Sequence, residues 1–288
     1  MKTDLLSGRH IGIEEKDMEH MLSTVGVKSL DELINQTIPS NIRLKKQQDL
    51  PAPMTEREYI EHVNALGAKN KLFTSYIGMG WYDSITPAVI QRNVLENPVW
   101  YTSYTPYQSE VSQGRLEALM NFQTVIADLT AMPLANCSLL DEATAAAEAA
   151  NMMFGLRPRD KQKSGANVLF VDKKIFPQTL AVINTRAVPQ GITVKTGNYK
   201  EFEFTPDVFG CIVQYPNSDG NVENYREFTE KAHAAGCKVS VAADIMSLVL
   251  LVPPGEWGAD IVFGSTQRLG TPMYYGGPSA AYFATRRF

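Results

Sequence analysis

From residue 165 onward, short apolar segments alternate with segments whose apolar residues recur at helical spacing. Strands are predicted at 167–172, 192–196, 211–217, 237–245, 260–265 and 279–285, with helices at 177–187 and 224–236. Continuous apolar strands that alternate with helices are typical of a mainly parallel sheet covered on both faces. The sequence therefore predicts an α/β domain whose ligands would lie at the carboxyl ends of the strands.

The part of the chain before this alternation is mainly helical. Amphipathic helices are predicted at 14–25, 29–36, 55–70, 115–130 and 139–156. Between them, residues 75–114 are rich in aromatic residues, proline and glycine, and long irregular segments of this kind tend to be functional. We expect a helical N-terminal arm over 1–70 and one large α/β domain over 71–288.

Composition and charge exclude several classes of function. The net charge is −4 without a long basic run, so we expect no nucleic-acid partner. No apolar stretch approaches the about 20 residues that cross a membrane, and the N-terminus lacks the apolar core of a signal peptide. The three cysteines and four histidines show no spacing typical of metal ligands. These features predict a cytoplasmic protein with no metal and no membrane partner.

Two residues at predicted strand ends suggest a cofactor site of a particular kind. Asp244 ends an apolar strand, where a carboxylate can pair with the ring nitrogen of pyridoxal phosphate or can cap the following turn. The lysine that would hold this cofactor is expected on a later turn, but Gln267 stands there and no lysine follows Lys238. Because an amide cannot form an imine, Gln267 cannot bind the aldehyde covalently.

Two other segments, a helix start and a loop, have features of binding sites. The helix that begins near Ser138 could bind a phosphate at its N-terminus, but Asp141 and Glu142 would repel an anion, which favours a structural role. The loop over 101–115 combines tyrosines, glutamines and Glu110 just before a helix. This loop is either a hydrogen-bonded surface segment or a segment that reaches into a site on another domain.

Three long motifs carry a resemblance to a known family. They are RHIG at 9–12, the run from YIGMGWYDSITPAV through YTSYTPYQSEVSQGRLEALM to IADLTAM at 76–132, and NCSLLDEATAAAEA at 136–149. The chain resembles the glycine decarboxylases, or P-proteins, of the glycine cleavage system, over essentially its whole length. It is similar to the amino-terminal half of that family.

The resemblance implies the fold of type I pyridoxal-phosphate-dependent transferases for the large domain. It also implies that the complete protein has two homologous halves, of which only the second carries the cofactor lysine. Gln267 and Asp244 are then vestigial positions, and the turn TQRLGTPMYYGGP at 266–278 is a degenerate lysine turn. Phe176 and Ser279 depart from the family pattern, which commonly has histidine at both positions, and both changes suit a site without cofactor.

The resemblance further implies a function and a set of partners. The family decarboxylates glycine on pyridoxal phosphate and transfers the aminomethyl group to the lipoyl arm of the H-protein. This chain would be inactive alone, would pair with the catalytic carboxy-terminal half, and is expected to form a homo-oligomer. The residues expected to act in the neighbouring active site are Tyr104, Thr105, Tyr107, Gln108 and Glu110.

Two alternatives to this reading stay open. The chain could be a pure scaffold that contributes nothing to the active site, or a stand-alone enzyme similar to an aminotransferase, which the missing lysine disfavours. The sequence also stops at ATRRF, just after the last predicted strand. The small C-terminal domain of type I enzymes is therefore expected to be lacking.

Overall fold

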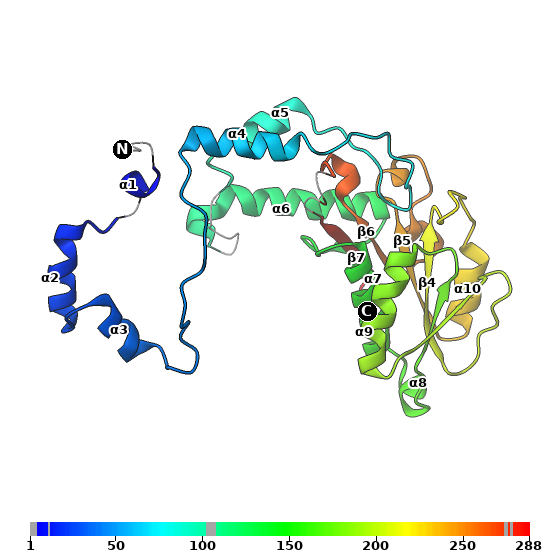
Figure 1. Cartoon of the computed structure of the whole chain (residues 1–288). Coiled ribbons are helices and arrows are strands. Elements are labelled where there is room, and N and C mark those ends of the chain that lie inside the picture. Colours follow the sequence, from blue (N-terminus) through cyan, green and yellow to red (C-terminus); the bar gives the residue numbers. More distant parts are fainter. Residues whose placement is uncertain (1–4, 11, 102–107, 274–275, 277–278) are drawn as a thin grey trace. The chain divides into compact units, whose positions relative to one another are not determined.

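The computed structural model describes residues 5–10, 12–101, 108–273, 276 and 279–288. The chain divides into two compact units, Met1–Thr74 and Ser75–Phe288 (Figure 1). The helices of the first unit are α1 Ser7–His10, α2 Glu15–Val25, α3 Leu30–Thr37 and α4 Glu56–Gly67. Those of the second unit are α5 Ala88–Ile90, α6 Ser109–Thr130, α7 Glu142–Gly155, α8 Arg159–Lys163, α9 Pro177–Ala187 and α10 Arg226–Ala234.

Local capping interactions define the helices of the first unit. The side chain of Ser29 accepts a hydrogen bond from the backbone N–H of Glu32 and so caps α3. At the start of α4, Thr55 and Glu58 form a reciprocal capping box, which satisfies two backbone N–H groups that a helix end leaves free. Within the described part of this unit, α2, α3 and α4 bury no residue, so these caps rather than a shared core fix where the helices begin.

The second unit is built on one seven-stranded sheet with the order β1-β7-β6-β5-β4-β2-β3. Its strands are β1 Leu134–Ala135, β2 Val168–Asp172, β3 Thr193–Gly197, β4 Val208–Tyr215, β5 Lys238–Ala243, β6 Ile261–Ser265 and β7 Ala281–Thr285. Neighbouring strands pair in parallel from β3 to β6, while β7 is antiparallel to both β6 and β1. This mixed, mainly parallel sheet with helices confirms the predicted fold class.

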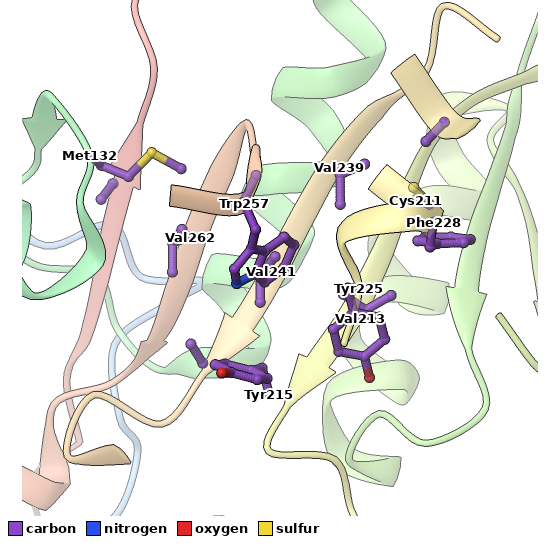
Figure 2. Close-up of a cluster of buried hydrophobic side chains, with 14 of the residues drawn as sticks. Met132, Cys211, Val213, Tyr215, Tyr225, Phe228, Val239, Val241, Trp257 and Val262 are labelled. Carbon is purple, nitrogen blue, oxygen red and sulfur yellow. The ribbon is translucent and has the colours of Figure 1, made fainter. Parts of the chain in front are cut away.

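Helices cover both faces of the sheet, and the strand residues alternate between two cores. On one face, Leu169 and Val171 pack with the alanines of α7 and with Ile183 of α9. On the other face, Phe170 packs with residues of α10, in the core that Figure 2 shows around Tyr225 and Trp257. Because β2, β4 and most of β5 are buried along their length, their polar groups can reach a ligand only at the strand ends.

The boundaries differ from the prediction mainly where polar residues continue an element. The helix predicted at 115–130 begins at Ser109 instead, with a kink at Ser112. The segment SEVSQG has no apolar periodicity, so its helical state could not be seen in the pattern. The short elements α8 and β1 were not predicted, since two to five residues carry too little periodic signal.

Gly264 provides a test of how closely β5 and β6 pack. A Cβ atom at Gly264 would lie 2.1 Å from the carbonyl oxygen of Ala243 and 2.8 Å from the ring of Tyr282. We expect Gly264→Ala to lower the free energy of unfolding by at least about 2 kcal/mol, because the strands must separate to admit the methyl group. Urea denaturation would measure the change.

The matched control is Gly114→Ala, in the exposed part of α6. A Cβ atom at Gly114 would have no atom within 4 Å among the described residues. There the substitution should stabilise the protein by about 0.5–1 kcal/mol, because alanine has the higher helix propensity. Equal effects of the two substitutions would contradict the close approach at Gly264.

Candidate functional site

The carboxyl ends of β4, β5 and β6 meet the start of α7 at one edge of the sheet and enclose a cavity of about 140 Å³. The cavity is lined by Gly80, Tyr82, Glu142, Phe176, Gln214, Pro216, Asn217, Gly220, Asp244, Ser265 and Arg268. A second cavity of about 350 Å³ shares Gly80, Glu142, Phe176 and Ser265 with the first. The site thus lies where the parallel sheet predicts a ligand, at the carboxyl edge.

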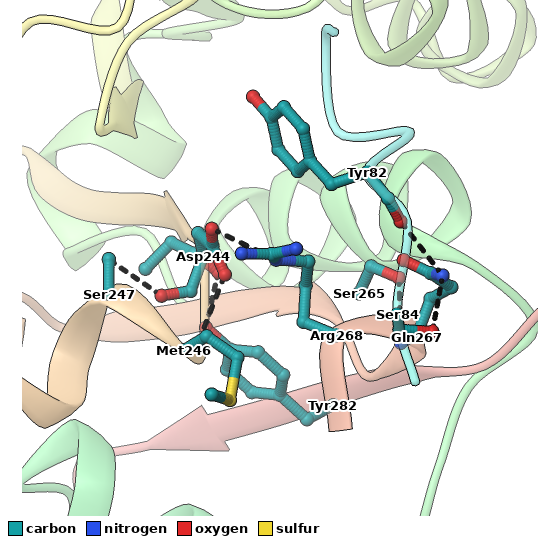
Figure 3. A network of polar contacts seen from close by, with 10 residues as sticks. Tyr82, Ser84, Asp244, Met246, Ser247, Ser265, Gln267, Arg268 and Tyr282 are labelled. Atoms are coloured by element: carbon teal, nitrogen blue, oxygen red, sulfur yellow. Dashed lines mark hydrogen bonds and ion pairs between the residues drawn. The ribbon is translucent and has the colours of Figure 1, made fainter. Parts of the chain in front are cut away.

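Asp244 follows β5 and makes two kinds of contact (Figure 3). Its Oδ1 accepts a hydrogen bond of 3.0 Å from the backbone N–H of Met246, so the carboxylate caps the turn after the strand. Its Oδ2 lies 3.4 Å from Nε of Arg268, an ion-pair distance without the alignment of a hydrogen bond. The Arg268 guanidinium also lies 4.8 Å from the ring centroid of Tyr82. Asp244 therefore already has a cationic partner within its own chain.

Gln267 is buried at the start of the turn after β6, with 4% of its surface exposed. Its amide nitrogen lies within hydrogen-bonding distance of three acceptors: the Tyr82 carbonyl at 3.1 Å, Ser84 Oγ at 3.2 Å and the Thr271 carbonyl at 2.8 Å. An amide group has two hydrogens, so these acceptors share them. Gln267 therefore fastens the 82–84 segment to the turn after β6 and does not present a free group to the cavity (Figure 3).

Two acids occupy the N-terminus of α7. Asp141 accepts a hydrogen bond of 2.6 Å from the backbone N–H of Thr144. The Asp141 carboxylate therefore caps the helix N-terminus at which a ligand phosphate could otherwise bind. Glu142 is half-buried beside it. The pKa of Glu142 is raised to about 7, mainly by burial and in smaller part by the nearby Asp244 carboxylate, while hydrogen bonds from the Ser265 backbone and the Gln214 amide oppose the rise.

These residues do not fit a covalently bound pyridoxal phosphate. No side chain of the described cavity lining is a lysine, and the only amide nitrogen at the expected position, that of Gln267, is already hydrogen-bonded. The start of α7, where a phosphate would bind, carries Asp141 and Glu142. Among the described residues, no side chain at this edge is therefore placed to hold the cofactor covalently.

The loop residues named from the sequence fall mostly outside the described part of the chain. Tyr104, Thr105 and Tyr107 lie outside the described residues. Gln108 precedes α6 and Glu110 lies in its first turn, both exposed. Neither of these two belongs to the described lining of the two cavities. Their predicted role in a neighbouring active site stays a prediction.

Sequence reasoning missed several residues that line the cavity, above all Tyr82, Gln214 and Arg268. A signal existed for two of them. Gln214 is a polar residue inside the apolar strand CIVQY, and Arg268 directly follows Gln267 on the turn already singled out. Tyr82 had no such signal, because the 78–86 segment approaches the site only through tertiary contacts such as the hydrogen bond from Gln178 Nε2 to the Met79 carbonyl.

The described residues hold no group of three or more histidine, cysteine or acidic side chains arranged to bind a metal ion. Among the described helices, none is both long and apolar enough to cross a membrane.

The sheet order, the antiparallel β7 and a site at the carboxyl ends of β4 to β6 define the class: an α/β protein with a mixed, mainly parallel sheet and a candidate ligand site at its carboxyl edge. Comparison with known proteins gives the family. The family profile described as Glycine cleavage system P-protein matches residues 8–288. The chain belongs to this family.

Individual relatives agree with the family. Over 286 residues the chain is 74% identical to a glycine dehydrogenase (decarboxylating) of Bacteroides fragilis and 53% identical to one of Flavobacterium johnsoniae. Each alignment covers 99% of this chain and 30% of the relative, so the chain spans about a third of the relatives' length. A crystal structure of glycine decarboxylase (P-protein) in inhibitor-bound form superposes with a TM-score of 0.84 at 34% identity, covering 96% of this chain and 62% of that one.

The raised pKa of Glu142 predicts a pH-dependent stability. The folded chain binds a proton at Glu142 up to about pH 7, whereas an unfolded glutamate releases it near its ordinary value of 4.5. The contribution of Glu142 to stability is therefore largest below pH 4.5 and is lost as the pH rises to 7. From pH 5 to pH 8, we expect Glu142→Gln to gain about 2 kcal/mol in unfolding free energy relative to the unmodified chain.

Urea denaturation of both proteins at the two pH values would measure this gain. Glu148→Gln is the control, because Glu148 lies on the same helix but is exposed and paired with Arg186. The difference in unfolding free energy between Glu148→Gln and the unmodified chain should change by less than about 0.5 kcal/mol from pH 5 to pH 8. If the difference in unfolding free energy between Glu142→Gln and the unmodified chain also stays constant with pH, Glu142 is ionised over the whole range.

Proposed function

We propose that this chain belongs to the amino-terminal, non-catalytic half of a glycine-cleaving decarboxylase. The observation that carries the proposal is Gln267, which stands where a type I enzyme needs its lysine and is buried in hydrogen bonds to Tyr82 and Thr271. In this proposal pyridoxal phosphate is bound by the catalytic half of the complete protein and supplies the electron sink for loss of CO2 from glycine. The lipoyl arm of the H-protein then accepts the aminomethyl group.

The role proposed for this chain is to support the catalytic half and to lend it loop residues. Apolar side chains around the second unit support an association, since Tyr76, Ile85 and Leu250 are each about nine-tenths exposed. Contiguous exposed apolar patches mark interaction surfaces on many proteins. We propose that the catalytic half covers part of it, and that the complete protein assembles into a homo-oligomer in the cytoplasm.

The first test asks whether the chain alone holds the cofactor. Purified chain is mixed with pyridoxal phosphate, reduced with borohydride, digested and mapped by mass spectrometry. We expect no reduced adduct between residues 240 and 288, because this stretch contains no lysine. We also expect no transamination of amino acids, which separates the proposal from a stand-alone aminotransferase. Catalytic turnover by the chain alone would overturn the proposal.

The second test asks whether the loop acts in the partner's active site. In the complete enzyme, Tyr107→Phe and Glu110→Gln should each lower the exchange of the glycine carboxyl carbon with bicarbonate by at least about tenfold, because groups that orient a reacting centre contribute a few kcal/mol. Cofactor content and thermal unfolding should stay unchanged. Glu117→Gln, also exposed on α6, is the control and should leave the exchange rate unaltered.

The outcome distinguishes the two remaining roles. If both loop variants exchange carbon at the unmodified rate, the chain is a scaffold and does not contribute to the pocket. Loss of exchange in the control as well would show that the helix, rather than the loop, is being disturbed.

A further inference from the structure

The segment 88–101 of the second unit is largely exposed and has few attachments to the rest of the chain. It contains α5, a π-helical turn over Gln91–Leu95 and a further turn that ends at Trp100. Among the described residues, its hydrogen bonds stay within 87–101, except for two that come from Arg115. The attachment of this segment to the rest of the second unit by hydrogen bonds therefore depends on Arg115.

Arg115 belongs to α6 and binds the end of the segment. Its Nη2 donates to the carbonyl of Val99 at 2.6 Å and to the carbonyl of Trp100 at 2.7 Å. Its guanidinium also lies 5.8 Å from the centroid of the Trp100 ring. One Nη nitrogen carries two hydrogens, so each carbonyl can accept one of them. Because the donor is charged, each bond is roughly twice as strong as one between neutral groups.

The part of α6 that carries Arg115 is attached to the core. Ile126 is fully buried there, and Phe122 packs against the same core. The first turn of α6 is different, because Ser112 has the non-helical φ of −130° and ψ of 20° and separates residues 109–111 from the rest of the helix. Arg115 lies three residues after this kink, on the side that is held by the core.

Arg115 thus connects the two described ends of the loop that the sequence singled out. The chain enters this loop after Trp100, whose carbonyl Arg115 binds. It leaves the loop at Gln108, which precedes the kinked turn with Glu110. A loop with a fixed entry has fewer arrangements to lose when it meets a partner, so its binding costs less entropy.

We propose that Arg115 is a positioning residue for the reaction of the complete decarboxylase. It fixes residues 99 and 100 to α6 and so sets where the chain enters the loop, which brings Glu110 and the loop to the catalytic half in one arrangement. Arg115 acts through the loop and not on the substrate. This inference rests on the proposed function, in which the loop is lent to the catalytic half.

The attachment itself is tested on the 288-residue chain. Cleavage by chymotrypsin after Trp100 and Tyr101 is followed by mass spectrometry, at protease concentrations where the rate reports how often the segment opens. Arg115→Met should raise this rate by at least about fivefold, because both charge-assisted bonds are lost. The control is Arg92→Met, since Arg92 is exposed on the same segment, and it should be cleaved at the unmodified rate.

The positioning role is tested in the complete enzyme. Arg115→Met should lower kcat for exchange of the glycine carboxyl carbon with bicarbonate by at least about tenfold, while KM for glycine changes by less than about twofold. The two constants differ because Arg115 orients groups at the reacting centre and does not bind glycine. Cofactor content and thermal unfolding should stay unchanged, and Arg92→Met should exchange carbon at the unmodified rate.

A double variant shows whether Arg115 acts through the loop. Residues that act as a unit give losses that do not multiply when both are replaced. Arg115→Met combined with Glu110→Gln should therefore lose no more than about threefold beyond the larger single loss. A purely structural role of Arg115 would instead give the product of the two single losses.

Three results would overturn the inference: an unmodified exchange rate in Arg115→Met, losses that multiply in the double variant, or cleavage that Arg115→Met does not accelerate. Should Arg115→Met not fold, Arg115→Lys takes its place in all three measurements, because lysine lacks the planar guanidinium. A full rate in Glu110→Gln contradicts the lending of the loop and overturns the inference with it. Loss of exchange in Glu110→Gln beside a full rate in Arg115→Met overturns the inference alone and leaves the proposed function in place.

Discussion

Burial of the central strands on both faces is the constraint on which the second unit depends. The strands β2 and β4 are buried from end to end, so polar groups along them must find partners inside the strand ladder or at its ends. Because β2 to β6 run in the same direction, their carboxyl ends meet at one edge. The charged groups Asp244, Glu142 and Arg268 gather there for that reason, independently of any particular chemistry.

At that edge, the groups that would hold a phosphorylated cofactor have partners of their own. Asp141 caps α7 where a phosphate would bind, Arg268 neutralises Asp244, and Gln267 binds the 82–84 segment. The three contacts come from two parts of the chain, the start of α7 and the turn after β6, and each engages a group that the cofactor would need. Loss of the lysine alone would remove only the covalent bond to the cofactor. Here the N-terminus of α7 and the carboxylate of Asp244 are also engaged, by other groups of the chain. Together these contacts indicate that the carboxyl edge of this sheet serves packing within the chain rather than binding of the cofactor.

Sequence alone predicted the sheet and the edge at which the site lies, because apolar strands and helical periodicity are strong local signals. Asp244 and Gln267 could be named from their positions at strand ends. Phe176 was named only through the family resemblance. Tyr82 could not be named at all, because it reaches the cavity through tertiary packing, which leaves no periodic pattern. The capping role of Asp244 was one of two alternatives left open, and the structure shows that it does cap the turn while also pairing with Arg268.

Packing does not account for every polar group at this edge. Gln267 and Gln214 are both buried glutamines with an unpaired Oε1, but their surroundings differ. Three acceptors surround the Gln267 nitrogen, so that side chain is explained by the segment it fastens. Gln214 fastens no segment, since its nitrogen contacts the neighbouring strand and Glu142, and its oxygen is buried without a hydrogen-bond partner among the described residues.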